Sequence, residues 1–493
     1  MTTVKIRLDG MGGMTMPEKT LKTVYASGLD FDPDERRLRI TPDGTVELQV
    51  TRTPYMVHAK IAVPLYGCLW VMADNLGQGY TGDFVDFVSE AVRTYIAHAQ
   101  RMASGMVLSV KTQAHLDAAV ELEHLANRGS DTPDNRLYAL SHAIYAAEGA
   151  LVERARQKVF AAPRTDLLLG CNFFRFTSAS SRYAKAFARA FDFATLPFYP
   201  GRTVPRQGCY DYSYVDQALD FLNEQGIAAK GHPLFFGHKE VNPDWMFGLS
   251  YPELRLAAEQ IAKHHVSAYA GSIQYWDAMN EAHDWANCFE LTQAQLIDLT
   301  RTTTSALRDA NDKAVSIVNV CLPFAEYAAG RYNCYGALPE HLRSPLQYFK
   351  TILEAGVDFD VVGIQLYFPG RDMVAVSLML EAFAALGKPV HITEMGVNGG
   401  FRVKGNAGSS WSQLDMSEGT WHGGWNEHTQ ADWMEQFYTV AAARDEIKAL
   451  TWWDFIEPSF SGNGAFLYED ENPREMYFRF LALKERLTKK PAP

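Results

Sequence analysis

Two glutamates stand at the ends of apolar, strand-like runs in the second half of the chain. Glu281 ends SIQYWDAMNE (272–281), directly after Asn280, and Glu394 lies in PVHITEMG (389–396). Lone carboxylic acids are seldom buried, so both invite a chemical explanation. Two carboxyl groups about 5 to 5.5 Å apart can cleave a glycosidic bond with retention, one attacking the anomeric carbon and the other protonating the leaving oxygen. The pair therefore indicates retaining β-glycoside hydrolysis without a cofactor or metal.

The neighbours of each glutamate assign the roles. The Asn280 amide is placed to donate to a sugar 2-hydroxyl, a contact that strengthens in the transition state. We therefore interpret Glu281 as the acid/base and Glu394 as the nucleophile. Trp276 lies in the same run as Glu281, and Trp452 and Trp453 lie in the last strand-like run, ALTWWDFIE (449–457). The plainer alternative is that each carboxylate is an ordinary strand-end residue in solvent or in a salt bridge.

The elements that must position these residues form a regular alternation after Pro163. Between helical patterns lie eight strand-like runs, at 166–173, 191–198, 227–236, 272–281, 314–321, 360–368, 389–396 and 449–457. This is the pattern of an α/β fold of the (β/α)8 TIM-barrel type, whose active site forms at the carboxyl ends of the strands. The competing doubly wound sheet usually carries GxGxxG after its first strand, which LLLGCNFFRF lacks.

The preceding part of the chain has a different organisation. Strand-like alternation and turn signals over residues 1–82 predict an N-terminal β-rich, sandwich-like accessory domain, and helical periodicity over 83–160 predicts a helical connecting segment. The catalytic barrel is then expected at 161–493. The first domain is either a sugar-binding module, with Tyr55, Tyr66 and Trp70, or a cover for apolar barrel surface, which we favour.

The amino-acid composition limits the classes of partner that the chain can bind. The net charge of −12 without a dense basic run argues against nucleic acid and membrane surfaces, whereas 12% aromatic residues suit stacking on sugar rings. The six cysteines show no metal-ligand spacing and are interpreted as buried thiols. The N-terminus lacks a secretory signal pattern, so the expected location is cytoplasmic, or secreted if a signal peptide was removed.

Several motifs in order resemble glycoside hydrolase family 10, the β-1,4-xylanase family. They are YAGSIQYWDAMNEA, VDFDVVGIQLYF, KPVHITEMGV and ALTWWDFIEPSFSGNGAFLYEDENPREMYF, with IAAKGHPLFF on the third strand, and they cover about 165 to 485. The resemblance implies the same two glutamate roles. It also implies that His232 lines the subsite of the cleaved sugar, that Gln365 approaches the reaction centre, and that Trp452 and Trp453 form an aromatic floor.

Two departures from the family bear on specificity. The Glu-Asn and Lys that hold xylose after the second strand are missing from LPFYPGRTVPRQGCYDYS, where Arg202 is the candidate replacement donor. The histidine that the family carries on the sixth strand, two residues after the glutamine, is replaced by Tyr367, whose hydroxyl is a candidate hydrogen-bond donor to the nucleophile. Xylan-like substrates remain the first expectation. A β-glucan or β-galactoside hydrolase of a sister family, exo-acting if loops close the cleft, is the alternative.

Two long connections are predicted to form the rim of the cleft. The first follows Glu394 and carries Trp411, Trp421 and Trp425, which either stack on sugars or anchor the loop to the barrel. The second follows the fifth strand and carries Tyr332 and Tyr335. Remoter readings are a non-catalytic carbohydrate-binding barrel and a metal hydrolase using His232, His238, His283 and Asp284.

Overall fold

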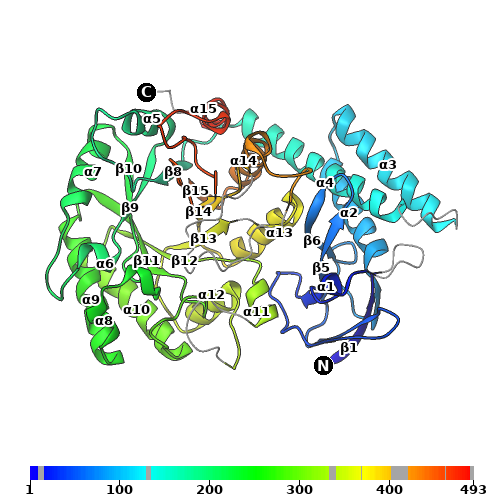
Figure 1. Ribbon diagram of the computed structural model, residues 1–493, viewed down its shortest axis with the longest axis horizontal. Coiled ribbons are helices and arrows are strands. Elements are labelled where there is room, and N and C mark those ends of the chain that lie inside the picture. The colour runs from blue at the N-terminus through cyan, green and yellow to red at the C-terminus, as the bar shows by residue number, and fades with distance from the viewer. Residues whose placement is uncertain are drawn as a thin grey trace.

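The predicted barrel is present in the computed structural model of the protein, which describes residues 1–8, 16–128, 135–331, 340–367, 369–400, 420–460 and 462–488. Eight parallel strands close in the order β10-β11-β12-β13-β14-β15-β8-β9 (Figure 1). The strands are β8 (Leu168–Asn172), β9 (Phe193–Pro197), β10 (Ala228–His232), β11 (Ile273–Asn280), β12 (Val315–Val320), β13 (Val361–Tyr367), β14 (Val390–Gly396) and β15 (Ile447–Trp452). Each corresponds to one predicted run, so the (β/α)8 prediction is confirmed.

Helices between the strands surround the barrel. They are α5 (Arg182–Ala190), α6 (Pro200–Thr203), α7 (Ser213–Glu224), α8 (Asp244–Phe247), α9 (Tyr251–Ala268), α10 (Gln293–Ala310), α11 (Glu326–Gly330), α12 (Pro345–Glu354), α13 (Met373–Ala384), α14 (Glu427–Ala442) and α15 (Glu475–Leu487), with the 3-10 turn η1 (Lys239–Val241). Capping boxes begin α9, α10 and α12 at Ser250, Thr292 and Ser344. These caps satisfy exposed backbone N–H groups and so define where each helix starts.

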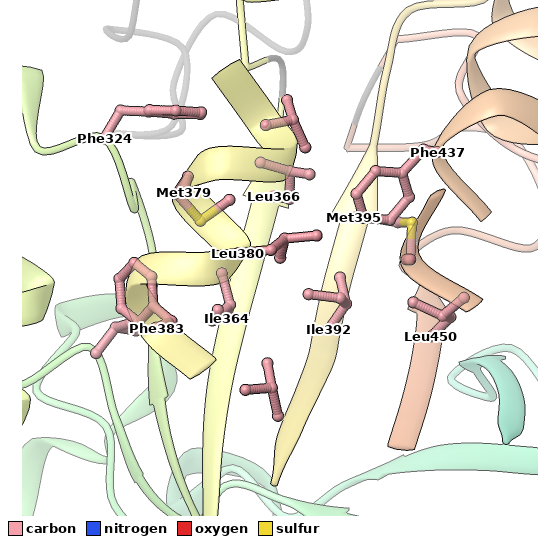
Figure 2. Close-up of a cluster of buried hydrophobic side chains, with 14 of the residues drawn as sticks. Phe324, Ile364, Leu366, Met379, Leu380, Phe383, Ile392, Met395, Phe437 and Leu450 are labelled. Carbon is pink, nitrogen blue, oxygen red and sulfur yellow. The ribbon is translucent and has the colours of Figure 1, made fainter. Parts of the chain in front are cut away.

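Apolar side chains on the outer face of the strands hold the helices in place. Figure 2 shows Ile364 and Leu366 of β13 packed beneath Met379, Leu380 and Phe383 of α13. Since side chains alternate along a strand, Gln365 and Tyr367 between them face the barrel interior. The apolar packing outside therefore aims the polar residues at the mouth.

The N-terminal part contains two small sheets and three long helices. Its elements are β1 (Thr2–Arg7), α1 (Glu18–Leu21), β2 (Tyr25–Ser27), β3 (Leu38–Ile40), β4 (Val46–Val50), β5 (Met56–Val63), β6 (Gly67–Ala73), β7 (Phe84–Asp86), α2 (Phe87–Ala103), α3 (Val110–Asn127) and α4 (Asn135–Ala161). One sheet has the order β3-β4-β1-β7 and the other β2-β5-β6. The first sheet is mixed, because β1 and β7 run parallel.

This N-terminal part packs against the barrel, with α4 contacting α14 (Figure 1). Tyr55 and Tyr66, considered above as sugar-stacking residues, are only 2% and 0% exposed. Trp70 lies edge-on to Tyr25, with the guanidinium of Arg371 5.6 Å from its ring. These aromatic side chains are engaged in internal packing.

A buried carboxylate on α4 joins the two parts. Glu148 accepts hydrogen bonds from the Tyr66 hydroxyl at 2.8 Å, the Met373 backbone N–H at 2.8 Å and the Trp421 indole at 3.2 Å. The His422 ring nitrogen lies 2.8 Å from its other oxygen. Glu148 therefore ties the turn before β6, the start of α13 and the segment before α14 to one helix.

Replacing Glu148 by alanine is expected to lower the free energy of unfolding by roughly 3 kcal/mol or more, because several buried donors lose their acceptor together. Urea denaturation followed by tryptophan fluorescence measures the change. Glu121→Ala on the exposed face of α3 is the control, and we expect it to stay within about 0.5 kcal/mol of the parent protein. Equal stability of the two variants would contradict the assigned role.

The prediction that all cysteines are buried is wrong for Cys209. Its side chain is exposed in the turn after α6, Cys68 and Cys288 are half-buried, and Cys171 and Cys321 are buried. Cys334 lies outside the described residues. Within the described part of the chain, no helix is long and apolar enough to cross a membrane.

Candidate active site

A cavity of about 300 Å³ opens at the carboxyl ends of the barrel strands. Its polar lining residues are His232, Asn280, Glu281, Gln365, Tyr367 and Glu394. Its aromatic lining residues are Phe174, Tyr199, Phe236, Trp285, Trp453 and Phe460. The volume of the cavity is at the lower end of the range for small-ligand sites. The carboxyl groups of Glu281 and Glu394 both line this cavity, together with the aromatic side chains.

Two β-bulges bring the key side chains into this cavity. In β11, Asp277 pairs with Ile317 but Met279 pairs with Val318, so Ala278 is an extra residue. In β14, Ile364 pairs with Ile392 but Gln365 pairs with Glu394, so Thr393 is extra. A bulge reverses the alternation of side chains beyond it. Asn280 and Glu394 consequently face the barrel interior, where strict alternation would turn them outward.

A network of side-chain amides links the two glutamates. Gln365 Nε2 donates to Glu281 Oε1 at 2.9 Å and lies 3.3 Å from Asn280 Oδ1. Asn319 Nδ2 donates to the same Asn280 oxygen at 2.7 Å and to Glu394 Oε1 at 3.2 Å. Because the bridging side chains are buried, they hold both carboxyl groups in defined orientations.

Glu281 is buried, and the main causes that shift its pKa do not include a positively charged side chain. Its carboxyl accepts hydrogen bonds from Gln365, Cys321 and Asn280, but burial dominates and raises its pKa to about 7. Its backbone is left-handed, with φ of 56°, a conformation that non-glycine residues rarely adopt outside constrained sites. The environment therefore favours the protonated acid near neutral pH.

Glu394 is also buried, but unlike Glu281 it lies near basic side chains. Burial, the strongest influence, raises its pKa to about 7, and Glu281 raises it further, whereas His232 and Lys230 lower it. His232 Nε2 lies 3.8 Å from Glu394 Oε1. The Tyr367 hydroxyl donates to Oε2 at 2.9 Å. Of the two carboxyl groups, Glu394 is thus the better placed to carry the negative charge.

A buried carboxylate orients His232. The Asp277 Oδ2 oxygen lies 2.6 Å from His232 Nδ1 and 2.8 Å from Lys230 Nζ. With Nδ1 engaged by Asp277, the opposite ring nitrogen points toward Glu394 and the cavity. The sequence interpretation missed Lys230, Asp277 and Asn319, although Asn319 lies near the end of the fifth predicted run.

Five of the predicted substrate-binding residues line the cavity: Asn280, His232, Gln365, Tyr367 and Trp453. The Trp453 ring lies edge-on to His232 at 5.3 Å. The predicted hydrogen bond from Tyr367 to Glu394 is present. Tyr199, considered only as part of the departure from the xylose-binding motif, also lines the cavity, edge-on to His232 at 5.4 Å.

The predictions for Trp276 and Trp452 are wrong, because both side chains are 0% exposed and lie on the outer face of the barrel. Trp276 packs edge-on to Phe198 at 4.8 Å, and Trp452 packs against Trp433 of α14 at 6.3 Å. Alternation along a strand turns neighbouring residues to opposite faces, so only Trp453 of the two consecutive tryptophans reaches the cavity.

The remaining predicted binding residues lie away from the cavity. Arg202 is exposed and stacks over the Tyr214 ring at 4.3 Å, in a separate groove that Tyr199 borders. Trp421 is 2% exposed and bonded to Glu148, and Trp425 stacks near it at 6.1 Å. Both tryptophans therefore anchor the loop rather than line the cavity. Trp411, Tyr332 and Tyr335 lie outside the described residues.

The candidate metal ligands are engaged in other contacts. Asp284 forms a buried salt bridge with Arg343, and His283 Nε2 lies 3.7 Å from the Cys321 sulfur. Among the residues that the structure describes, no group of three or more His, Cys, Asp or Glu side chains is arranged to hold a metal ion.

Comparison with known proteins agrees with this geometry. The family model for glycosyl hydrolase family 10 matches residues 175–481. Endo-1,4-beta-xylanase B of Thermotoga neapolitana is 24% identical over 349 residues, which cover 65% of this chain and 88% of that protein. An endo-1,4-beta-xylanase/feruloyl esterase of Xylanibacter ruminicola is 26% identical over 278 residues, covering 52% of this chain and 36% of that protein.

A solved structure described as a psychrophilic glycoside hydrolase family 10 endo-beta-1,4-xylanase shares the fold. It has a TM-score of 0.50 and 19% identity, and the match covers 64% of this chain and 96% of that one. The matched part corresponds in size to the barrel, whereas the N-terminal sheets and helices α2 to α4 precede the residues that the family model matches.

Proposed function

Because the chain belongs to glycosyl hydrolase family 10 and is a retaining glycoside hydrolase, we propose that it cleaves a β-linked, xylan-like oligo- or polysaccharide by double displacement at Glu281 and Glu394. The observation that carries this proposal is the difference between the two buried carboxyl groups. Lys230, His232 and Tyr367 act on Glu394, whereas amides and a thiol face Glu281. One group is thereby suited to be the nucleophile and the other the acid.

In the first step the Glu394 carboxylate attacks the anomeric carbon and forms a glycosyl ester. The Glu281 carboxylic acid donates its proton to the glycosidic oxygen as the bond to the leaving group breaks. The Asn280 side chain, held between Asn319 and Gln365, is positioned to contact the sugar 2-hydroxyl. The leaving alcohol departs neutral, and Glu281 is left ionised.

In the second step Glu281 acts as a base. It removes a proton from a water molecule, which attacks the anomeric carbon and releases Glu394 as the carboxylate. Two successive inversions give net retention. The raised pKa of about 7 suits Glu281 to both roles, since a group that gives and then takes a proton works best when its pKa lies near the operating pH.

The relatives support a preference for xylan-like substrates, whereas one part of the site argues against it. Both curated relatives described above are named as xylanases. The second strand, however, ends at Pro197 and is followed by Phe198 and Tyr199, and of these three residues only Tyr199 lines the cavity. A hydrolase acting on β-glucan or β-galactoside oligosaccharides is therefore the second candidate.

Product analysis of xylan, xylo-oligosaccharides, cello-oligosaccharides and aryl β-galactosides tests both candidates. We expect release of shorter xylo-oligosaccharides, with the β-anomer of the new reducing end seen first by proton NMR. Exclusive turnover of the gluco or galacto substrates would replace the first candidate by the second. Initial formation of the α-anomer would contradict double displacement.

Replacing Tyr367 by phenylalanine is expected to reduce kcat/KM by roughly 10- to 100-fold, since a hydrogen bond to a charged group contributes about 1.5–3 kcal/mol. The lost donor stabilised the Glu394 anion, so the pKa of Glu394 should rise and the acidic limb of the pH profile should move to higher pH. Steady-state kinetics across pH measure both effects. Tyr468→Phe, at an exposed position bonded to Glu427, is the control, and an unmoved acidic limb in Tyr367→Phe would contradict the assignment.

A further inference from the structure

The two halves of the cavity differ in chemistry. The strands β13, β14, β15, β8 and β9 and the residues just after them contribute Tyr367, Gln365, Glu394, Trp453, Tyr199, Phe174 and Phe460. The arc β10 to β12 contributes His232, which lies toward Glu394, then Asn280 and Glu281 and a wall that follows them. We define this acid-side wall as Phe236, Val241, Trp285, Cys321 and Leu322. None of its side chains carries a hydroxyl, a carboxamide or a formal charge.

The mechanism proposed above determines what this wall contacts. The nucleophile lies beneath the anomeric carbon, so the sugar whose bond is cleaved occupies the Glu394 side. The acid must contact the glycosidic oxygen, so the leaving group extends past Glu281. Since Glu281 directly follows β11, residues that follow β10, β11 and β12 enclose the leaving group.

We propose that the acid-side wall is a subsite that prefers an apolar leaving group, an alkyl or aryl aglycone, to a second sugar. The proposal rests on the double displacement assigned to Glu281 and Glu394. A buried sugar hydroxyl without a partner is costly. The described residues of this wall carry no hydroxyl, carboxamide or charged group, and their polar atoms are the Trp285 indole N–H and the Cys321 thiol. An alkyl or aryl group gains from the same surface by leaving water.

The residues of the wall pack against one another. Phe236, Trp285 and Cys321 belong to a buried apolar cluster, separate from the main core, against which Val241 and Leu322 pack. The Trp285 ring lies 5.5 Å from the ring of Tyr327. The Tyr327 hydroxyl points away to the His283 carbonyl at 3.2 Å, so the cluster presents its apolar side to the cavity.

Hydrogen-bonding groups are concentrated on the opposite side. Tyr199 stands edge-on to His232, and Tyr367 and Gln365 contact the two glutamates. The sugar ring beside Glu394 therefore meets several donors and acceptors, while the group beyond Glu281 meets three hydrocarbon side chains, the Trp285 indole and the Cys321 thiol. This division matches a glycoside with one polar and one apolar end.

Alkyl glycosides of increasing length test the proposal. Ethyl, butyl and hexyl β-xylobiosides release alcohols of nearly equal acidity, so differences in kcat/KM report contacts of the chain rather than bond breaking. We expect kcat/KM to rise about two- to fourfold for each methylene that reaches the wall. We also expect the hexyl glycoside to be cleaved faster than xylotriose at the corresponding bond.

Two variants locate the effect. Leu322 has φ of 50°, a conformation that asparagine accepts readily, and Val241→Thr changes little in shape, so both Leu322→Asn and Val241→Thr should fold. Each is expected to reduce the ratio of hexyl to ethyl kcat/KM by about threefold or more. Leu256→Asn, at a leucine 52% exposed on α9, should leave that ratio unchanged.

The outcomes distinguish this proposal from the function on which it rests. β-Xylobiosyl fluoride, whose leaving group is one atom, reports the nucleophile without the wall. Turnover of the fluoride with a flat alkyl series, or with a clear preference for xylotriose over the hexyl glycoside, would overturn the apolar subsite alone. Failure to turn over the fluoride would overturn the xylan-like function itself.

Discussion

Replacement of Glu394 by alanine should abolish turnover, with a loss on the order of 10⁶-fold, the scale seen when a covalent nucleophile is removed. Without the carboxylate no glycosyl ester can form, and the remaining groups only bind and polarise the substrate. The measurement is the initial rate with 2,4-dinitrophenyl β-xylobioside, whose leaving group departs without a proton. Circular dichroism and thermal unfolding show whether the variant retains its fold.

Added azide separates the nucleophile from a merely structural residue. In Glu394→Ala the anion can enter the space beside the anomeric carbon and displace the leaving group once, so the product should be the α-glycosyl azide. Glu354→Ala, at an exposed position near the end of α12, should keep full activity and form no azide adduct. Activity of Glu394→Ala close to that of the parent enzyme would rule out the nucleophile assignment.

The elements that position these residues could be predicted because their sequence pattern is local. Each of the eight apolar runs overlaps one barrel strand, and polar residues at the ends of four of these strands, β10, β11, β13 and β14, line the cavity. Burial on both faces explains why the runs are continuous. Glu281 and Glu394 were accessible to this reasoning, because a carboxylic acid interrupts an otherwise apolar pattern.

The errors in the predicted site residues arise where one extra residue in a strand changes the direction in which the neighbouring side chains point. The extra residues Ala278 and Thr393 reverse which side chains face inward, and a bulge of this kind leaves no clear mark in composition. Trp276 therefore seemed to accompany Asn280 into the site, although it packs outside the barrel. Aromatic residues near a site serve the core as readily as the substrate.

Other parts of the site depend on contacts between distant segments. Lys230 and Asp277 meet across neighbouring strands, and Asn319 bridges two catalytic segments 39 and 75 residues away. Periodicity reports only which residues share a face of one element. The contact of Trp421 with Glu148, 273 residues apart, was hidden for the same reason, since α4 reaches the loop only in the folded chain.

Replacement of Glu281 by glutamine is expected to have the second-largest effect, and its size should depend on the leaving group. Loss of a general acid costs about 10²- to 10⁴-fold when the leaving group is a sugar or an aliphatic alcohol. The 2,4-dinitrophenolate needs no proton, so formation of the glycosyl ester should be slowed far less. A pre-steady-state burst followed by slow hydrolysis would show that the ester accumulates when the base is missing.

The pH dependence of kcat/KM tests the roles of the two glutamates independently. Glu394 must be ionised, so kcat/KM for xylotriose rises with pH as that carboxyl loses its proton, and Glu281 must be protonated, so kcat/KM falls as the second proton leaves. Burial raises the pKa of each group to about 7, and because the sites interact, the two limbs belong to the pair and should flank neutral pH. In Glu281→Gln the basic limb should disappear while the acidic limb remains, since Glu394 still titrates. The same loss of the basic limb in Glu354→Ala, or its persistence in Glu281→Gln, would remove Glu281 from the acid/base role.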